Sequence, residues 1–221
     1  MAFTLDTYLV TQEGLSAGRS TESIVDAALA GGVDVVQVRE KHSTARTQLD
    51  VAESLREPTA EADVPLIIND RIDIALAADA DGVHLGDDDL PISVAREQLG
   101  DDAIIGRSVS TVEAAREAEE AGADYLGVGA VYTTASKDVD DENNGIGLET
   151  VEDIADAVDI PFVGIGGVTP GRAPDVVEAG ADGVAVITAI TEEDDPEQAT
   201  RELGEAVEQG KRRRDTLEGE A

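Results

Sequence analysis

The sequence predicts an α/β protein built as a single (β/α)8 barrel, the TIM-barrel fold of parallel strands with helices outside. The first observation is an internal repeat, in which small residues and one aspartate precede a short apolar run. The repeats lie roughly 40 to 60 residues apart, which is long enough for two strands and two helices in each interval. The four repeated aspartates are Asp34, Asp81, Asp124 and Asp182.

The second observation is that a further apolar run occupies each interval. We expect a strand directly after each repeated aspartate, and the other four strands in segments 4–12, 64–70, 103–109 and 160–167. The strands are nearly continuous in apolar residues, which is typical of a parallel sheet that is covered on its outer side. Eight such units favour a closed barrel, and an open doubly wound sheet is the alternative. No glycine-rich dinucleotide motif follows the first strand.

The third observation is a helical pattern between the strands. In segment 111–122 Ala114, Ala118 and Ala121 recur on one helical face, and segment 148–159 has a similar pattern. We expect eight helices, a barrel domain over residues 1–210 and a charged C-terminal tail over 211–221. We interpret the basic run 211–214 as cations that close the last helix.

The composition restricts the classes of function. The net charge is −33, from 49 acidic and 16 basic residues, and such a charge disfavours nucleic acid as a partner. Salt screens self-repulsion, so we interpret the charge as adaptation to a salt-rich cytoplasm. No apolar run approaches the length of a membrane span. We therefore expect a soluble, cytoplasmic protein with no membrane partner, and the sequence leaves a homo-oligomer open. Cysteine is absent, so a metal would need oxygen ligands or His42 or His84.

The second predicted strand carries polar residues on one face. Gln37, Arg39 and Lys41 alternate with Val36 and Val38, so the three polar side chains share a side. One interpretation is an exposed edge strand protected by its cations. In a barrel, however, the same residues rise along the inner face to the carboxyl ends of the strands, where active sites lie. There the two cations would suit an anion such as phosphate.

Acidic residues follow the next two strands. Asn69 and Asp70 end one strand, and the triplet 87–89 follows the other. Carboxylates from neighbouring strands, close to cations that favour a polyphosphate, predict a Mg²⁺ site.

A second anion site is predicted on the opposite side. Gly166 and Gly167 follow the seventh strand and Thr188 follows the eighth, which is where barrels often bind phosphate. The long loop 133–147 could cover the site. We interpret His84 as a packed interior histidine rather than a base, and Ser108 as a residue that hydrogen-bonds within the cavity or to the backbone.

Seven motifs in order resemble thiamine-phosphate synthase: QVREK, IINDR, GVHLGDDD, IGRS, TTASK, GIGG and VAVITAI. The resemblance implies a Mg²⁺-dependent transferase. It would join 4-amino-2-methyl-5-(diphosphooxymethyl)pyrimidine to 4-methyl-5-(2-phosphoethyl)thiazole, or to its carboxylated tautomer, and release pyrophosphate by dissociative substitution. A thiazole tautomerase and a non-catalytic phosphate-binding barrel are the alternatives.

The resemblance also implies roles for particular residues. The pyrimidine diphosphate would contact Gln37, Val38, Arg39, Glu40, Lys41, Asn69, Ser108 and Lys137, of which Arg39, Lys41, Ser108 and Lys137 would be catalytic. The thiazole phosphate would contact Thr134, Ala135, Ser136, Gly167, Ile187 and Thr188. Asp70 and Asp89 would hold Mg²⁺. The chain departs from the family at Asp87, often glutamine there, and at Thr133 and Ser136, where a proline and a threonine are usual. Asp87 could therefore mean that another member of the triplet meets the metal.

Overall fold

Eight parallel strands form a closed barrel in the computed structural model, which describes residues 4–41, 43–134 and 145–220. Each strand pairs with the next along the chain, and β1 closes the barrel against β8. The (β/α)8 prediction is confirmed, and the open sheet and the exposed edge strand are wrong. The strands are β1 (Thr7–Val10), β2 (Val35–Val38), β3 (Leu66–Asn69), β4 (Gly82–Leu85), β5 (Ile104–Val109), β6 (Tyr125–Gly129), β7 (Phe162–Ile165) and β8 (Gly183–Val186).

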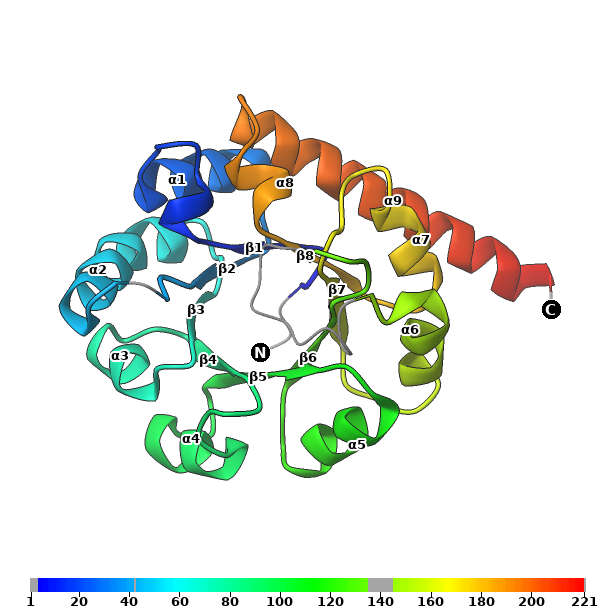
Figure 1. Cartoon of the computed structure of the whole chain (residues 1–221), viewed down its shortest axis with the longest axis horizontal. Coiled ribbons are helices and arrows are strands. Elements are labelled where there is room, and N and C mark those ends of the chain that lie inside the picture. The colour runs from blue at the N-terminus through cyan, green and yellow to red at the C-terminus, as the bar shows by residue number, and fades with distance from the viewer. Residues whose placement is uncertain (1–3, 42, 135–144, 221) are drawn as a thin grey trace.

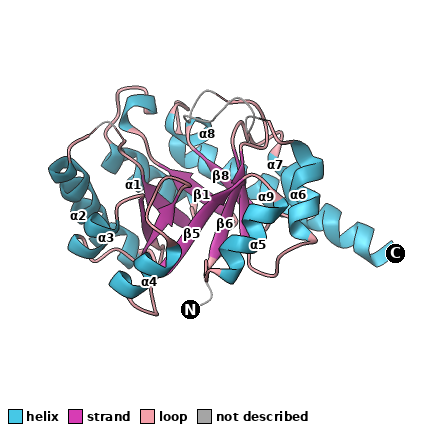
Figure 2. Ribbon diagram, turned by 60° about the horizontal axis from the view of Figure 1, so that its bottom comes forward, coloured by secondary structure: helices cyan, strands magenta, loops and turns pink. Residues whose placement is uncertain are grey.

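The helices form a ring around the strands (Figures 1 and 2). One difference from the expected eight helices is the short α8, which precedes the long α9 after the last strand. The helices in the described part of the chain are η1 (Glu13–Leu15), α1 (Thr21–Gly31), α2 (Ala45–Glu61), α3 (Ile72–Ala77), α4 (Ile92–Leu99), α5 (Val112–Glu120), α6 (Gly147–Ala155), α7 (Ala173–Glu178), α8 (Thr188–Thr191) and α9 (Pro196–Glu220).

The strands separate two buried cores because alternate side chains point to opposite faces. Residues such as Leu9, Val36 and Val38 pack outward in the larger core, together with helical residues. The neighbouring positions Tyr8 and Val35 belong to the smaller core inside the barrel. Gln37 is 3% exposed, and it lies on the inner face, as its alternation with Val36 and Val38 predicts.

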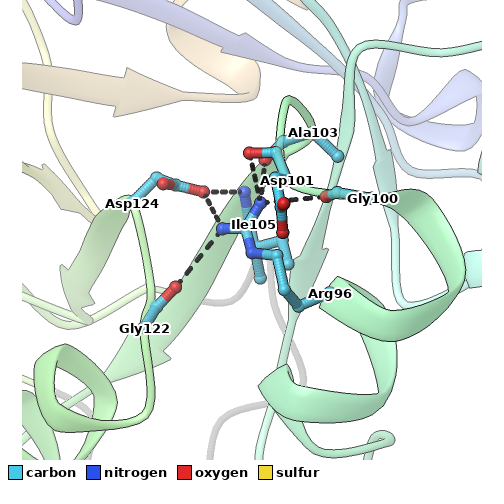
Figure 3. Close-up of polar contacts among 7 residues, drawn as sticks. All are labelled: Arg96, Gly100, Asp101, Ala103, Ile105, Gly122 and Asp124. Atoms are coloured by element: carbon cyan, nitrogen blue, oxygen red, sulfur yellow. Dashed lines mark hydrogen bonds and ion pairs between the residues drawn. The ribbon is translucent and has the colours of Figure 1, made fainter.

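The four repeated aspartates explain the sequence repeat. Each accepts a backbone hydrogen bond near the start of the preceding odd-numbered strand: Asp34 from Thr7 N, Asp81 from Leu66 N, Asp124 from Ile105 N and Asp182 from Phe162 N, at 2.7 to 2.9 Å. Figure 3 shows Asp124, which also accepts from Arg96 Nη2 at 2.6 Å. The repeat therefore marks a structural bond that ties one strand to the next.

Helix α9 runs across residue 211 and continues to Glu220, so the expectation that the basic run closes the last helix is wrong. Instead Lys211 forms an ion pair with Asp6 at 2.6 Å, and Arg213 forms one with Asp175 at 2.9 Å. These cations hold α9 against the barrel. The domain boundary at residue 210 stays a prediction. Over the residues that the structure describes, no helix has the length and apolar character of a membrane span.

Candidate active site at the carboxyl ends of the strands

A cavity of about 410 Å³ lies at the carboxyl ends of β2 and β3, where Glu40, Lys41, Asn69 and Asp70 line it. Arg39 follows β2 and is 4% exposed, and its Nη1 donates to Gln12 Oε1. Burial raises the pKa of Asp70, and the positive charges of Lys41 and Arg39 partly oppose this rise, so both cations lie near this carboxylate. The structure thus brings together the two cations and the acidic residue that the sequence predicts there.

Two carboxylates, from Asp70 and Asp89, approach each other at this end of the barrel. Burial, followed by the contact with Asp89 and its negative charge, raises the pKa of Asp70 to about 6. Asp89 Oδ2 accepts from Gly86 N at 2.6 Å. Asp88 is exposed, and Asp87 forms an ion pair with Arg107 with 85% of its side chain exposed. Of the triplet, therefore, Asp89 turns toward Asp70.

Among the described residues, these two carboxylates do not belong to a larger ligand cluster. The described residues contain no group of three or more histidine, cysteine, aspartate or glutamate side chains arranged to hold a metal. Two carboxylates fit Mg²⁺, since this ion usually keeps several waters and binds one or two carboxylates together with substrate phosphates.

Glu40 and Val38 line the cavity, and their side chains also contact neighbouring parts of the fold. Glu40 accepts from the hydroxyls of Thr11 and Thr21 at 3.0 and 2.8 Å, and from Glu13 N at 3.0 Å. The Val38 side chain packs in the outer core. Glu40 therefore ties β2 to the segment after β1.

A chain of polar side chains crosses the barrel interior below this cavity. Gln37 Nε2 donates to Tyr8 OH at 2.8 Å, and Tyr8 OH lies 2.7 Å from Tyr125 OH. His84 Nδ1 lies 2.9 Å from Tyr125 OH, and His84 Nε2 lies 2.9 Å from Ser108 Oγ. His84 is thus an interior, hydrogen-bonded histidine. Sequence reasoning missed both tyrosines, because strands that read as apolar give no signal for a hydroxyl partner.

A second cavity, of about 340 Å³, lies at the ends of β7 and β8 and is lined by Gly167, Ile187, Thr188 and Thr134. Gly166 and Gly167 have φ of +99° and +63°, a region that favours glycine. A Cβ on Gly167 would lie 2.9 Å from Tyr132 Cβ. The close approach of these backbones explains the glycine pair.

Backbone amides near this cavity are available to a ligand. Within the described part of the chain, the N–H groups of Gly167, Val168, Thr188 and Ala189 donate to no backbone or side-chain acceptor. Free N–H groups of this kind attract phosphate oxygens. The arrangement is that of an anion-binding cradle.

Sequence reasoning missed Arg172, which also lines the second cavity. Its guanidinium lies 4.6 Å from the centre of the Tyr132 ring, and its Nη1 donates to Gly167 O at 2.9 Å. A cation five residues after the glycine pair is the signal that could have found it. Three predicted site residues, Ala135, Ser136 and Lys137, lie outside the described residues, as does His42.

The fold and these two polar cavities define the class of protein: a (β/α)8-barrel enzyme whose site lies at the carboxyl ends of its strands. The family model described as thiamine monophosphate synthase matches residues 7–190. The chain belongs to this family and is a transferase of thiamine biosynthesis.

The relatives span nearly the whole chain. The thiamine-phosphate synthase of Natronomonas pharaonis is 66% identical over 201 residues, which cover 91% of this chain and 94% of that protein. The one from Haloarcula marismortui is 66% identical over 207 residues, which cover 93% and 98%. A solved thiamine phosphate pyrophosphorylase from Pyrococcus furiosus is 41% identical with a TM-score of 0.85, and the match covers 93% and 96%. Both archaea at 66% identity are halophiles, in keeping with the acidic composition.

Proposed function

We propose that this protein joins 4-amino-2-methyl-5-(diphosphooxymethyl)pyrimidine to 4-methyl-5-(2-phosphoethyl)thiazole and releases pyrophosphate; with the carboxylated tautomer of the thiazole, CO2 would leave as well. The observation that carries the proposal is the pair of cavities, one with cations and carboxylates and one with a glycine cradle. Their contents match a metal-dependent diphosphate on one side and a monophosphate on the other. The alternative tautomerase needs the second cavity but has no use for the first.

In the first cavity, Arg39 and Lys41 would bind the diphosphate, with Lys137 as a third cation. Asn69 and Ser108 would contact the pyrimidine and the leaving group. Val38 and Glu40 would contribute backbone groups. Gln37, which donates to Tyr8 inside the barrel, would contact the pyrimidine diphosphate from the inner face of β2.

Asp70 and Asp89 would hold Mg²⁺. The fit is supported by the closeness of the two carboxylates: burial, followed by the contact with Asp89 and its charge, raises the pKa of Asp70, and a bound divalent cation would offset that repulsion. When bound, Mg²⁺ would neutralise charge on the departing pyrophosphate.

In the second cavity, Gly167, Ile187 and Thr188 would bind the thiazole phosphate through backbone N–H groups and a hydroxyl. Thr134, Ala135 and Ser136 would contact it from the loop after β6. Arg172 adds a cation at the rim, in contact with the Gly167 carbonyl.

The reaction that this arrangement supports is a dissociative substitution. The bond between the pyrimidine methylene carbon and the diphosphate oxygen breaks, and Arg39 and Lys41 bind the leaving group. The thiazole nitrogen then attacks the methylene carbon from the other cavity. Such a reaction depends on positioning and electrostatics more than on a general base.

We also propose that the protein acts in the cytoplasm. Its sequence is compatible with a homo-oligomer.

Calorimetric titration of each substrate against two variants tests the two-site proposal. The double variant Arg39→Met/Lys41→Met should lose at least tenfold in affinity for the pyrimidine diphosphate with Mg²⁺, since each charge-assisted contact contributes roughly 1.5–3 kcal/mol. The same variant should bind thiazole phosphate almost as before. Gly167→Val should show the reverse pattern by filling the cradle. Arg46→Met, on an exposed position of α2, is the control.

The result that contradicts the proposal is specific. If the wild type binds thiazole phosphate but has no affinity for the pyrimidine diphosphate with Mg²⁺, the synthase reaction fails and a tautomerase or a binding barrel takes its place.

A further inference from the structure

Arg107 on β5 binds the turn 86–89, which follows β4 and carries Asp89. We infer that Arg107 is a positioning residue for the metal site, because it fixes this turn so that the Asp89 carboxylate stays against Asp70. The inference deepens the proposed function and rests on it in one respect, since it takes Asp70 and Asp89 as the Mg²⁺ ligands.

Strand alternation explains how Arg107 reaches the turn. The next residue, Ser108, faces the barrel interior, where its Oγ lies 2.9 Å from His84 Nε2. Arg107 therefore points to the outer face of β5. It is aligned with Leu85 in neighbouring β4, and Gly86 directly follows Leu85. The register thus places the guanidinium beside the first residue of the turn.

The guanidinium holds two groups of the turn at once. Arg107 Nη1 donates to Gly86 O, and Nη2 donates to Asp87 Oδ1 at 2.8 Å. The Arg107 side chain is largely buried, whereas the Asp87 side chain is exposed. Salt screens an exposed ion pair. We therefore assign the larger effect to the bond with the main-chain carbonyl of Gly86.

Bonds within the turn connect this carbonyl to Asp89. Asp89 N donates to the same Gly86 O at 3.2 Å, and Gly86 N donates to Asp89 Oδ2 at 2.6 Å. A Cβ on Gly86 would lie 3.3 Å from Asp89 Oδ2, so the carboxylate packs directly against the glycine. A displacement of Gly86 would therefore displace the Asp89 carboxylate with it.

The Asp89 carboxylate needs this support because it lies against a second carboxylate. Burial, followed by the contact with Asp89 and its charge, raises the pKa of Asp70, which shows that the two groups are close. Two like charges at close range repel each other, so the repulsion favours an open turn when no metal is bound. Groups that orient metal ligands without touching the metal change its affinity by about ten- to hundredfold.

The same arrangement accounts for Asp87, where the chain departs from the family. The Asp87 carboxylate forms its ion pair with Arg107. A glutamine at this position would also offer an oxygen acceptor to the guanidinium. Asp87 therefore belongs to the support of the turn, and it does not displace Asp89 as the candidate metal ligand.

The sign of the effect separates positioning from charge. A cation close to a metal site opposes the binding of a second cation, so loss of the Arg107 charge alone would strengthen Mg²⁺ binding. Loss of its hydrogen bonds would instead let the turn open and weaken Mg²⁺ binding. Molar potassium chloride reduces the effect of the charge and leaves the effect of the hydrogen bonds.

The first experiment follows the turn in the metal-free protein by hydrogen exchange and NMR. The amides of Gly86 and Asp89 should exchange about tenfold faster in Arg107→Met than in the wild type, because the turn opens more often. Arg116→Met, at an exposed position of α5, removes the same charge and is the matched control. Unchanged exchange of both amides in a folded Arg107→Met overturns the inference.

The second experiment is calorimetric titration with Mg²⁺ alone in molar potassium chloride. Arg107→Met should bind Mg²⁺ roughly ten- to hundredfold more weakly than the wild type. Arg107→Lys keeps the charge without the planar fork, so it should also bind Mg²⁺ more weakly. Asp87→Ala should lose roughly two- to fivefold, and Asp87→Gln should restore the affinity. The double variant Arg107→Met/Asp87→Ala should lose little more than Arg107→Met, because Asp87 acts through Arg107.

The outcomes separate this inference from the proposed function. If Arg107→Met binds Mg²⁺ as tightly as the wild type or more tightly, the positioning role is wrong and the proposed reaction is unaffected. If the wild type forms no thiamine phosphate while Mg²⁺ affinity falls in Arg107→Met, the reaction is wrong and the positioning role holds. A wild type that forms product without any affinity for Mg²⁺ contradicts the inference alone. Should Arg107→Met not fold, Arg107→Lys and the exposed Asp87→Ala give the same comparison.

Discussion

The sharpest prediction concerns the choice between neighbouring aspartates. Asp89→Asn should lower turnover strongly, whereas Asp88→Asn should change it little. Asp89 lies next to Asp70 and is held by Gly86 N at 2.6 Å, while Asp88 is exposed. The two variants remove the same charge from adjacent residues, so the overall charge of the protein is matched between them.

The magnitude follows from the role of the charge. If Asp89 helps to hold Mg²⁺ against the departing pyrophosphate, its loss removes an electrostatic contribution of about 3 kcal/mol to the transition state. That corresponds to roughly a hundredfold in rate. The pKa of Asp70 should also fall in Asp89→Asn, because the contact with Asp89 and its charge both raise it.

The assay is steady-state turnover at saturating substrates, repeated over a range of Mg²⁺ concentrations. Asp89→Asn should need more Mg²⁺ for half-maximal rate, and Asp88→Asn should match the wild type. A severe Asp88→Asn together with a silent Asp89→Asn would refute the reasoning and give the metal contact to another member of the triplet.

Four further predictions concern pH, salt and stability. Because the pKa of Asp70 is raised to about 6, Mg²⁺ affinity should fall up to tenfold per pH unit below pH 6, as titration calorimetry would show, whereas a pH-independent affinity contradicts it. The raised pKa also means that the metal-free fold loses stability as pH rises from about 4 to about 6. The −33 charge predicts a higher Tm in molar potassium chloride than in dilute buffer, and an equal Tm would end that explanation. Asp124→Ala should cost about 1–3 kcal/mol in the free energy of unfolding, since it leaves Ile105 N without this acceptor and removes the ion pair with Arg96. Denaturant titration against the exposed control Asp102→Ala checks this, and equal midpoints would contradict it.

The barrel could be predicted from sequence because its signals are local and repeated. Apolar strands alternate with helical patterns, and the four aspartates mark where alternate strands begin. The bond that each aspartate makes could not be predicted, because it joins residues about 15 to 30 positions apart and depends on how neighbouring strands align. A repeated residue shows that a position matters without showing its partner.

The site could be predicted in part for a similar reason. Strand alternation correctly placed Gln37 on the inner face, and strand ends correctly brought Lys41 and Asp70 to one cavity. Alternation also shows that the Val38 side chain points outward, although the resemblance to the family implies that this residue contacts the pyrimidine diphosphate. The interaction of Tyr8 with Tyr125 joins strands far apart in the sequence, and no spacing rule reveals it. Arg172 was missed because its role depends on the fold of the loop after β7.

The most direct test of the central claim is a product assay with the purified protein. Both thiamine precursors are supplied with Mg²⁺ at high salt, and mass spectrometry follows thiamine phosphate while a coupled assay follows pyrophosphate. We predict that the two products form in equal amounts, and that neither forms in Arg39→Met/Lys41→Met. Binding of both substrates by the wild type without either product would contradict the claim.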